Sequence, residues 1–211
     1  MTPSDRSRPY IIIGGGGHAK VLIDMLQEQE CKIIGFTEKN DNCENILGVR
    51  CIGTDDAISK YDYNDVFLVN GIGSIGDQSY RRKIFERFVS KGYFFPAVIS
   101  ASSDLSKDVK IGFGVQIMRG VLIQSGVKIE DNSIVNTGAI IDHDCYIGKH
   151  VHIAPGVTIS GGVTIEEMSH IGTGAKIIQG IKIGREALVA AGAVVINNLP
   201  EKTCVKGVPA K

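Results

Sequence analysis

The fold is decided by a stretch in the second half of the chain, which reads IVNTGAIIDHDCYIGKHVHIAPGVTI over residues 134–159. Aliphatic residues recur in it at every sixth position, as Val135, Ile141, Ile147, Ile153 and Ile159. A period of six belongs neither to an α-helix nor to a simple β-strand, whose periods are 3.6 and two. It is typical of a short flat strand followed by a corner, so the stretch predicts a solenoid of strands and turns.

The same period continues in both directions. Stepping by six from Leu105 to Val195 meets an Ile, Leu or Val at each of sixteen positions. Three such units make a coil of 18 residues, and stacked coils form a prism whose faces are parallel sheets with strands roughly 4.8 Å apart. We expect about five coils, with the aliphatic side chains inside and small residues such as Ala139 and Cys145 at tight inward positions.

The first half shows the alternation of an α/β unit. Apolar runs at 10–13, 32–36 and 65–69 predict strands, and apolar positions 21, 22, 25 and 26 predict a helical stripe. A second amphipathic helix is expected over 80–91. This order favours a small parallel sheet of Rossmann-like type. We therefore expect a flexible N-terminus at 1–9, an α/β domain at 10–97, and a β-helix domain with a C-terminal tail at 98–211.

Composition excludes several classes of protein. The 211 residues carry 23 Lys+Arg and 23 Asp+Glu, and this zero net charge argues against a general nucleic-acid binder. No apolar run is long enough for a transmembrane helix, and the polar N-terminus is not expected to be a signal peptide. Five cysteines without CxxC spacing make a disulfide framework or a zinc ribbon improbable, so we expect a cytoplasmic protein without a metal.

The repeat resembles that of the hexapeptide-repeat acyltransferases, whose prism is a left-handed parallel β-helix. The end of the chain, residues 207–211, is similar to the tail that these enzymes place near coenzyme A. Segments 13–20, 34–36 and 136–145 resemble the subgroup that modifies sugars, which includes sialic acid O-acetyltransferases and bacterial N-acetyltransferases of nucleotide-linked 4-amino sugars. The resemblance covers nearly the whole chain, and it alone supplies the left hand, because parallel crossovers are ordinarily right-handed.

Acetyl transfer from a thioester needs a base that accepts a proton and a donor that holds the developing oxyanion. His143 follows the inward Ile141 by two residues, at an expected corner, and Asp144 beside it could fix the imidazole tautomer. Gly161 lies 18 residues later, at the same corner one coil higher, where its N–H is accessible to a thioester carbonyl. From spacing alone, ordinary corner residues remain an equally good interpretation.

The resemblance implies roles for these residues. It makes His143 the catalytic base, Asp144 the acid that hydrogen-bonds it, and Gly161 the oxyanion donor. It also implies a homotrimer with a site between two prisms, where His152 approaches from a neighbouring subunit. His150 and His170 match nothing in the family and are expected at the surface. The residues implied for acetyl-CoA binding are His152, Gly161, Gly192, Lys206, Gly207 and Pro209.

A glycine-rich turn precedes the first helix and has the pattern G-x-G-x-x-A from Gly14 to Ala19. Its amides and the helix N-terminus suit a diphosphate. Rossmann dinucleotide domains share the pattern, and Glu38 stands where a ribose-binding acid could lie. In the family this domain holds the nucleotide of the sugar, and His18 reaches towards the active site. The residues expected to bind the substrate are Gly14, Gly16, Gly17, His18, Glu38, Lys39, Asn70, Gly71 and Asn136.

Two departures from the family leave the nucleotide open between UDP and GDP. Residues 37–39 read Thr-Glu-Lys where a pair of acids often stands, and the loop from Asn70 to Gly76 is extended. We expect an N-acetyltransferase that uses acetyl-CoA on the 4-amino group of a nucleotide-linked amino-deoxy sugar, in bacterial surface glycan or glycoprotein biosynthesis. The alternatives are a sialic acid O-acetyltransferase and a non-catalytic sugar-nucleotide-binding protein. An NAD-dependent oxidoreductase would leave the hexads unexplained.

Overall fold

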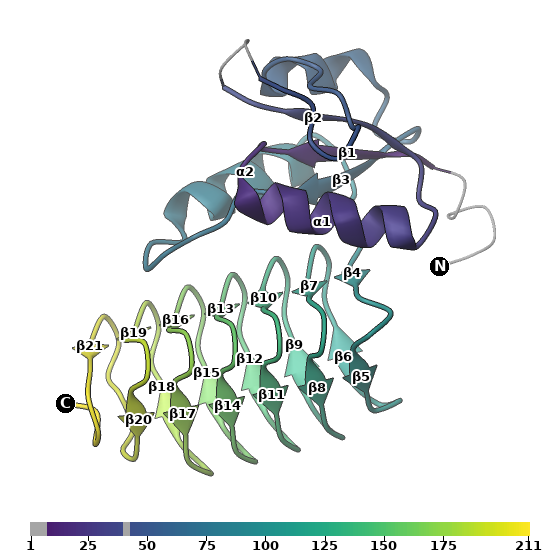
Figure 1. Cartoon of the computed structure of the whole chain (residues 1–211). Helices are drawn as coiled ribbons and strands as arrows, with labels where there is room; N and C mark the ends of the chain where they lie inside the picture. Colours follow the sequence, from purple (N-terminus) through teal and green to yellow (C-terminus); the bar gives the residue numbers. More distant parts are fainter. Residues whose placement is uncertain (1–7, 40–42) are drawn as a thin grey trace. The chain divides into compact units, whose positions relative to one another are not determined.

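The computed structural model describes residues 8–39 and 43–211 (Figure 1). They form two compact units. The first comprises the described residues up to Gly73 together with Lys83–Val98, and the second comprises Ser74–Arg82 together with Ile99–Lys211. Residues 1–7 of the expected flexible N-terminus lie outside the described residues.

The first unit contains the predicted parallel sheet, in the strand order β2-β1-β3. Its strands are β1 (Tyr10–Ile13), β2 (Ile33–Thr37) and β3 (Phe67–Asn70), and its helical segments are α1 (Gly17–Glu28), the 3₁₀ helix η2 (Asp55–Lys60) and α2 (Ser79–Val89). Helix α2 begins in the second unit and continues into the first. All four residues of the central strand β1 are buried, as its uninterrupted aliphatic run predicts.

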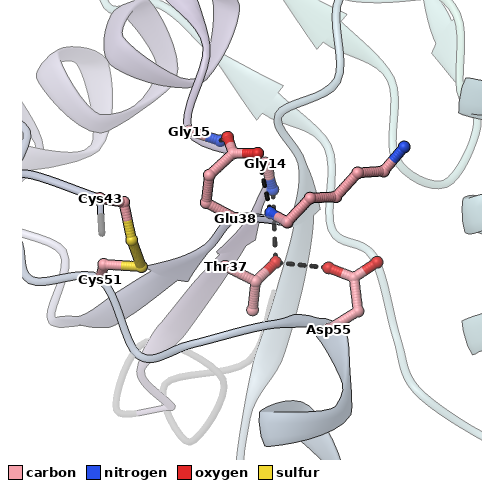
Figure 2. Close-up of a disulfide and its surroundings, with 8 residues drawn as sticks. Gly14, Gly15, Thr37, Glu38, Cys43, Cys51 and Asp55 are labelled. Carbon is pink, nitrogen blue, oxygen red and sulfur yellow. Dashed lines mark hydrogen bonds between the residues drawn. A yellow bond between two sulfur atoms is a disulfide. The ribbon is translucent and has the colours of Figure 1, made fainter. Parts of the chain in front are cut away.

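One disulfide joins Cys43 and Cys51 (Figure 2). The cysteine count and spacing argued against disulfides, so this bridge corrects that expectation. Its cause is the course of the chain after β2. Cys51 pairs with Phe36 of β2, and an antiparallel bridge between Ile46 and Val49 turns the intervening chain back on itself. The other three cysteines, Cys31, Cys145 and Cys204, are free thiols.

The second unit is built on a left-handed parallel β-helix with two-residue strands (Figure 1). Its three faces hold seven, six and five strands, which makes about six turns rather than the five expected. The seven-stranded face contains β4 (Val98–Ile99), β7 (Gln116–Ile117), β10 (Ile134–Val135), β13 (His152–Ile153), β16 (His170–Ile171), β19 (Leu188–Val189) and β21 (Cys204–Val205).

The six-stranded face contains β5 (Asp104–Leu105), β8 (Leu122–Ile123), β11 (Ile140–Ile141), β14 (Thr158–Ile159), β17 (Lys176–Ile177) and β20 (Val194–Val195). The five-stranded face contains β6 (Lys110–Ile111), β9 (Lys128–Ile129), β12 (Tyr146–Ile147), β15 (Thr164–Ile165) and β18 (Lys182–Ile183).

The register of the strands explains the period of six. Ile141 pairs with Ile123 in the coil below and with Ile159 in the coil above, so residues 18 apart stack in columns. From Ile117 onwards each aliphatic of the series is buried, whereas Leu105 and Ile111 at the open end are half-buried. The repeat is therefore a core pattern, and the first residue of each strand is left to face outwards.

None of the helices among the described residues combines the length and the apolar character needed to cross a bilayer.

Candidate active site

His143 and Asp144 form the corner between β11 and β12. The His143 Nδ1 lies 2.8 Å from the Asp144 Oδ2, and both side chains are largely exposed. Asp144 has φ of 56°, in the left-handed region that Gly126 and Gly162 occupy one coil below and one coil above. Among residues with a side chain, Asp tolerates this region well, so the turn can hold a carboxylate beside the ring. The structure thus brings together the two residues proposed as base and orienting acid.

The carboxylates at this corner change the ionisation of the ring. The hydrogen bond to Asp144, followed by the charge of Asp142, raises the pKa of His143 above its ordinary value. Because Asp144 accepts from Nδ1–H, the neutral ring has its lone pair at Nε2. That atom is therefore the one able to accept a proton from a substrate.

The imidazole of His143 lies against the backbone of Gly161. A Cβ built on Gly161 would lie 2.6 Å from the His143 Nε2 and 2.7 Å from its Cε1, so only glycine fits beneath the ring. Within residues 8–39 and 43–211, the Gly161 N–H donates no hydrogen bond, whereas its carbonyl accepts one from the Gly180 N–H at 3.0 Å. A base and an uncommitted N–H donor thus lie at one corner, which is what acyl transfer requires.

Cys145 follows this corner, and its position excludes a role as a covalent nucleophile. Its side chain is buried, with the Sγ 3.3 Å from the Ser160 carbonyl oxygen, as the inward small position predicts. Burial is the main cause that raises the pKa of the thiol to about 11. A thiol of this kind holds almost no thiolate near neutral pH.

His152 and Asn136 come together elsewhere on the prism. His152 faces outwards from β13, in the seven-stranded sheet, whereas His143 lies at the corner between the other two sheets. The Asn136 Nδ2 lies 3.3 Å from the His152 Nε2, and the Ser74 carbonyl oxygen lies 2.9 Å from the His152 Nδ1. The half-coil separation that the sequence suggested for His143 and His152 therefore places them on different parts of the prism.

His150 and His170 are not surface residues, and the structure corrects that expectation. Each is about 7% exposed. Asn132 Nδ2 lies 2.9 Å from the His150 Nδ1, and Gln78 Nε2 lies 3.4 Å from the His170 Nδ1. Burial lowers the pKa of both rings, for His150 to about 4 with a further contribution from Arg82. The cover comes from Ser74–Arg82, a segment distant in sequence that hexad spacing could not reveal.

In the first unit the glycine turn lies beside the end of β2 (Figure 2). The Gly15 N–H donates to the Glu38 Oε2 at 2.9 Å, and the Lys39 N–H donates to the Glu38 Oε1 at 2.8 Å. Thr37 Oγ1 accepts from the Gly14 N–H at 3.4 Å. The turn and the residues after β2 are thus one hydrogen-bonded group.

Gly16 and Gly17 open helix α1 on the same turn. Among the residues that the structure describes, no atom lies within 4 Å of a Cβ built at either position, and no side chain caps the N-terminus of α1. The first turn of α1 thus lacks a side-chain cap, which suits it to an anion. His18 follows on α1, and a Cβ at Gly73 would lie 3.3 Å from the His18 Cβ.

Asn70 ends β3 and Gly71 follows it, beside the same turn. The Gly71 N–H donates to the Ile13 carbonyl at 2.8 Å, and a Cβ there would lie 2.6 Å from the Ile12 Cγ2. Asn70 is buried, with its Oδ1 3.3 Å from the Ile72 N. Gly71 therefore has a packing role, and Asn70 lies at the carboxyl end of a parallel strand, where α/β sheets bind ligands.

The remaining candidates lie towards the end of the β-helix. Gly192 occupies a corner with φ of 69°, and a Cβ there would meet no atom within 4 Å. Lys206 and Lys211 exchange two backbone hydrogen bonds of 3.0 and 3.1 Å, which close the tail containing Gly207 and Pro209 into a loop. The tail is therefore an ordered turn against the last coils.

Three participants in these clusters were missed from the sequence. Asp55 accepts from the Thr37 hydroxyl at 2.6 Å, Gly15 donates to Glu38, and Ser74 binds His152. The position of Gly15 inside the glycine turn was a usable signal. Asp55 and Ser74 belong to no motif, and only the folded chain brings them to their partners.

No group of three or more His, Cys, Asp or Glu side chains suited to a metal ion occurs in the described part of the chain.

Comparisons with known proteins identify the family of this chain. Residues 10–88 match the family described as PglD N-terminal domain, and residues 108–143 match the bacterial transferase hexapeptide family of six repeats. The perosamine N-acetyltransferase PerB of Caulobacter crescentus, solved with CoA and GDP-perosamine, is 35% identical with a TM-score of 0.89. That match covers 97% of each chain.

Two further solved structures are similar. The acetyltransferase domain of PglB from Neisseria gonorrhoeae, in complex with acetyl coenzyme A, is 32% identical with a TM-score of 0.88, covering 97% of this chain and 98% of that one. WeeI from Acinetobacter baumannii is 26% identical with a TM-score of 0.85, covering 97% and 99%. The chain therefore belongs to the sugar-modifying hexapeptide-repeat acetyltransferase family that joins a PglD-type N-terminal domain to a left-handed β-helix.

Proposed function

We propose that the protein transfers an acetyl group from acetyl-CoA to the 4-amino group of an amino-deoxy sugar linked to UDP or GDP. The product would serve bacterial surface glycan or glycoprotein biosynthesis. The observation that carries the proposal is the 35% identity over nearly the whole of both chains with an enzyme that acetylates such a sugar. The corner formed by His143, Asp144 and Gly161 supplies the matching chemistry.

The proposed reaction is a direct attack. The lone pair of the sugar amine bonds to the thioester carbonyl carbon while the His143 Nε2 accepts a proton from the nitrogen. The carbonyl π electrons move to oxygen, and the Gly161 N–H stabilises the resulting oxyanion. Collapse of the tetrahedral intermediate breaks the C–S bond, and the coenzyme A thiolate takes the proton from the His143 imidazolium.

The binding of the two substrates is proposed to be divided between the units. In the first unit, the open N-terminus of α1 holds the diphosphate, and the residues beside the glycine turn hold the nucleoside and sugar. These are Gly14, Gly16, Gly17, His18, Glu38, Lys39, Asn70 and Gly71. In the second unit Asn136 is proposed as a further substrate-binding residue, and His152, Gly161, Gly192, Lys206, Gly207 and Pro209 are proposed to bind acetyl-CoA.

The proposal is tested with a panel of nucleotide sugars and acetyl-CoA, monitored by release of the free thiol. We expect turnover with at least one UDP- or GDP-linked 4-amino sugar and none with free sialic acid. Acetylation of free sialic acid, with all amino sugars inert, would support the O-acetyltransferase alternative. Binding of the sugar nucleotides without any turnover would support a non-catalytic binding protein.

Substitution of Gly16 by valine should raise the KM for the sugar nucleotide and leave acetyl-CoA binding unchanged. The backbone of Gly16 has φ of −81°, and no atom of the described residues lies within 4 Å of a Cβ built there, so the described part of the protein tolerates a side chain. A diphosphate on the N-terminus of α1 would meet that side chain. Initial rates with each substrate varied in turn separate the two effects. A selective loss of acetyl-CoA binding would contradict the assignment of this unit.

A homotrimer with shared sites is proposed as the active assembly. Leu122 and Ile140 leave 39% of their surface exposed on adjacent strands of the six-stranded face, an apolar pair suited to burial against another subunit. Mixing inactive His143→Ala chains with inactive His152→Ala chains should then restore part of the activity, because a mixed interface can combine both intact residues. Sedimentation as a monomer would exclude the arrangement.

A cytoplasmic location is part of the same proposal. The three free thiols support it, since free cysteines are typical of reducing compartments, while the Cys43–Cys51 bridge is the feature opposed to it.

A further inference from the structure

His152 has a hydrogen-bond partner at each ring nitrogen, and the first partner fixes one proton. Its Nδ1 lies 2.9 Å from the carbonyl oxygen of Ser74 and 3.2 Å from the Ser74 hydroxyl. A carbonyl oxygen can only accept a hydrogen bond. The proton of this contact must therefore be on Nδ1 of the imidazole.

The second partner is oriented independently. The Asn136 Oδ1 lies 2.8 Å from the backbone N of Thr137 and 3.3 Å from the Thr137 hydroxyl. A backbone N–H can only donate, so this end of the amide is the oxygen and the opposite end is the NH₂ group. That NH₂ group lies 3.3 Å from the His152 Nε2. Because it can only donate, Nε2 must be the unprotonated nitrogen.

We propose that Ser74 and Asn136 are positioning residues that hold His152 as a neutral imidazole with its proton on Nδ1. The inference concerns the same site as the proposed function and rests on it for its catalytic meaning. If a proton were added at Nε2, the resulting N–H would face the Asn136 NH₂ group. Both groups are hydrogen-bond donors, so the hydrogen bond between them would be lost. His152 is accordingly unable to exchange protons with the reactants, and proton transfer is confined to His143.

The ring of His152 is closely packed and nearly buried. Its ring packs edge-to-face on that of His170, with centroids 4.9 Å apart, and only 7% of its surface is exposed. Gln78, from the segment that carries Ser74, has its Nε2 3.4 Å from the His170 Nδ1. The same segment brings the cations Arg81 and Arg82, which help to lower the pKa of His150. His143 is the opposite case, an exposed ring held against a carboxylate.

The test is nitrogen NMR of the histidine side chains in the full-length protein without ligands, with the His152 signals identified by their loss in His152→Gln. At pH 7 we expect a proton on Nδ1 and none on Nε2. A neutral ring protonated at Nε2, or a cationic ring, would overturn the inference. This readout is independent of turnover, so a failure of the nucleotide-sugar panel would overturn the proposed function alone.

A second arm uses the isosteric variant Asn136→Asp. The new carboxylate accepts from Nε2–H, so His152 becomes doubly protonated, and its cation-to-neutral ratio at pH 7 should rise about tenfold or more. The acetylation rate should fall near neutral pH and recover as the pH rises and the ring loses its extra proton. Asn198→Asp is the matched control, because within the described residues Asn198 uses only its Oδ1, at 2.8 Å from the Lys182 N, at an exposed site. An unchanged ring charge in Asn136→Asp would refute the role of Asn136.

Discussion

Replacing His143 with alanine is expected to lower kcat by roughly 10²–10⁴-fold while acetyl-CoA binding stays nearly unchanged. The His143 Nε2 is the proton acceptor at the corner shared with Gly161, so its loss removes base catalysis. Residual turnover of the variant should increase with pH, because a free sugar amine is already a nucleophile once deprotonated. Single-turnover rates with a 4-amino nucleotide sugar, together with acetyl-CoA titrations, measure both quantities. A loss smaller than tenfold would remove His143 from the mechanism.

The pH profile of the wild-type enzyme provides a control for this assignment. Asp144 raises the pKa of His143, and only the neutral ring can act as a base, so kcat/KM should fall as pH drops through that raised pKa. In Asp144→Asn the largest of the raising influences is lost while that of Asp142 stays, so the acidic limb of the profile should move to lower pH. An acidic limb that stays in place would show that another group controls it.

Replacing Gly161 with alanine is expected to lower kcat by about 10²-fold without unfolding the protein. Gly161 has no positive φ, so its backbone accepts an L-residue, and the obstacle to the methyl group is the His143 ring, with Nε2 at 2.6 Å. The ring must turn away from its place above the coil, and a displacement of about 1 Å is enough for such a loss. Thermal unfolding and kcat, measured on the same preparation, separate the two effects.

A double variant isolates the cause. In the His143→Ala background the ring is gone, so adding Gly161→Ala should cause little further loss of rate. Equal fractional losses in both backgrounds would mean that Gly161 acts independently of His143, through its own N–H or through the fold.

The β-helix could be predicted from the sequence because its information is local and repeated. Each hexad places one aliphatic residue at the inward position of a strand, and Ile141, Ile147 and Ile153 are buried as this pattern predicts. His143 and Gly161 could be paired for the same reason, since a spacing of 18 residues corresponds to one coil. In a solenoid with a constant repeat, the number of residues between two positions therefore predicts whether they lie at the same corner.

The parts that could not be predicted depend on chain segments outside the repeat. His170 was expected at the surface because it matches no site residue of the family, yet Gln78 approaches it across 92 residues of sequence. Cys43 and Cys51 meet through the path of an irregular loop. Glu38 was named from the sequence as a substrate-binding residue, but its hydrogen bond with the Gly15 N–H was not predicted, because that contact depends on the register of β1 and β2. Such contacts carry no periodic signature.

The membership of Ser74–Arg82 in the second unit affects how the protein can be divided. The polypeptide passes from the first unit to the second, back, and forward again, so no single cut separates two self-sufficient fragments. A fragment ending near residue 98 would keep Gln78 and Arg81, each about 2% exposed here, without the prism they belong to. A β-helix fragment beginning there would leave His152 and His170 without their cover. A chimaeric enzyme that takes its β-helix from a relative must therefore take this nine-residue segment from the same relative. The junctions then fall at the two ends of the segment and at the start of the prism.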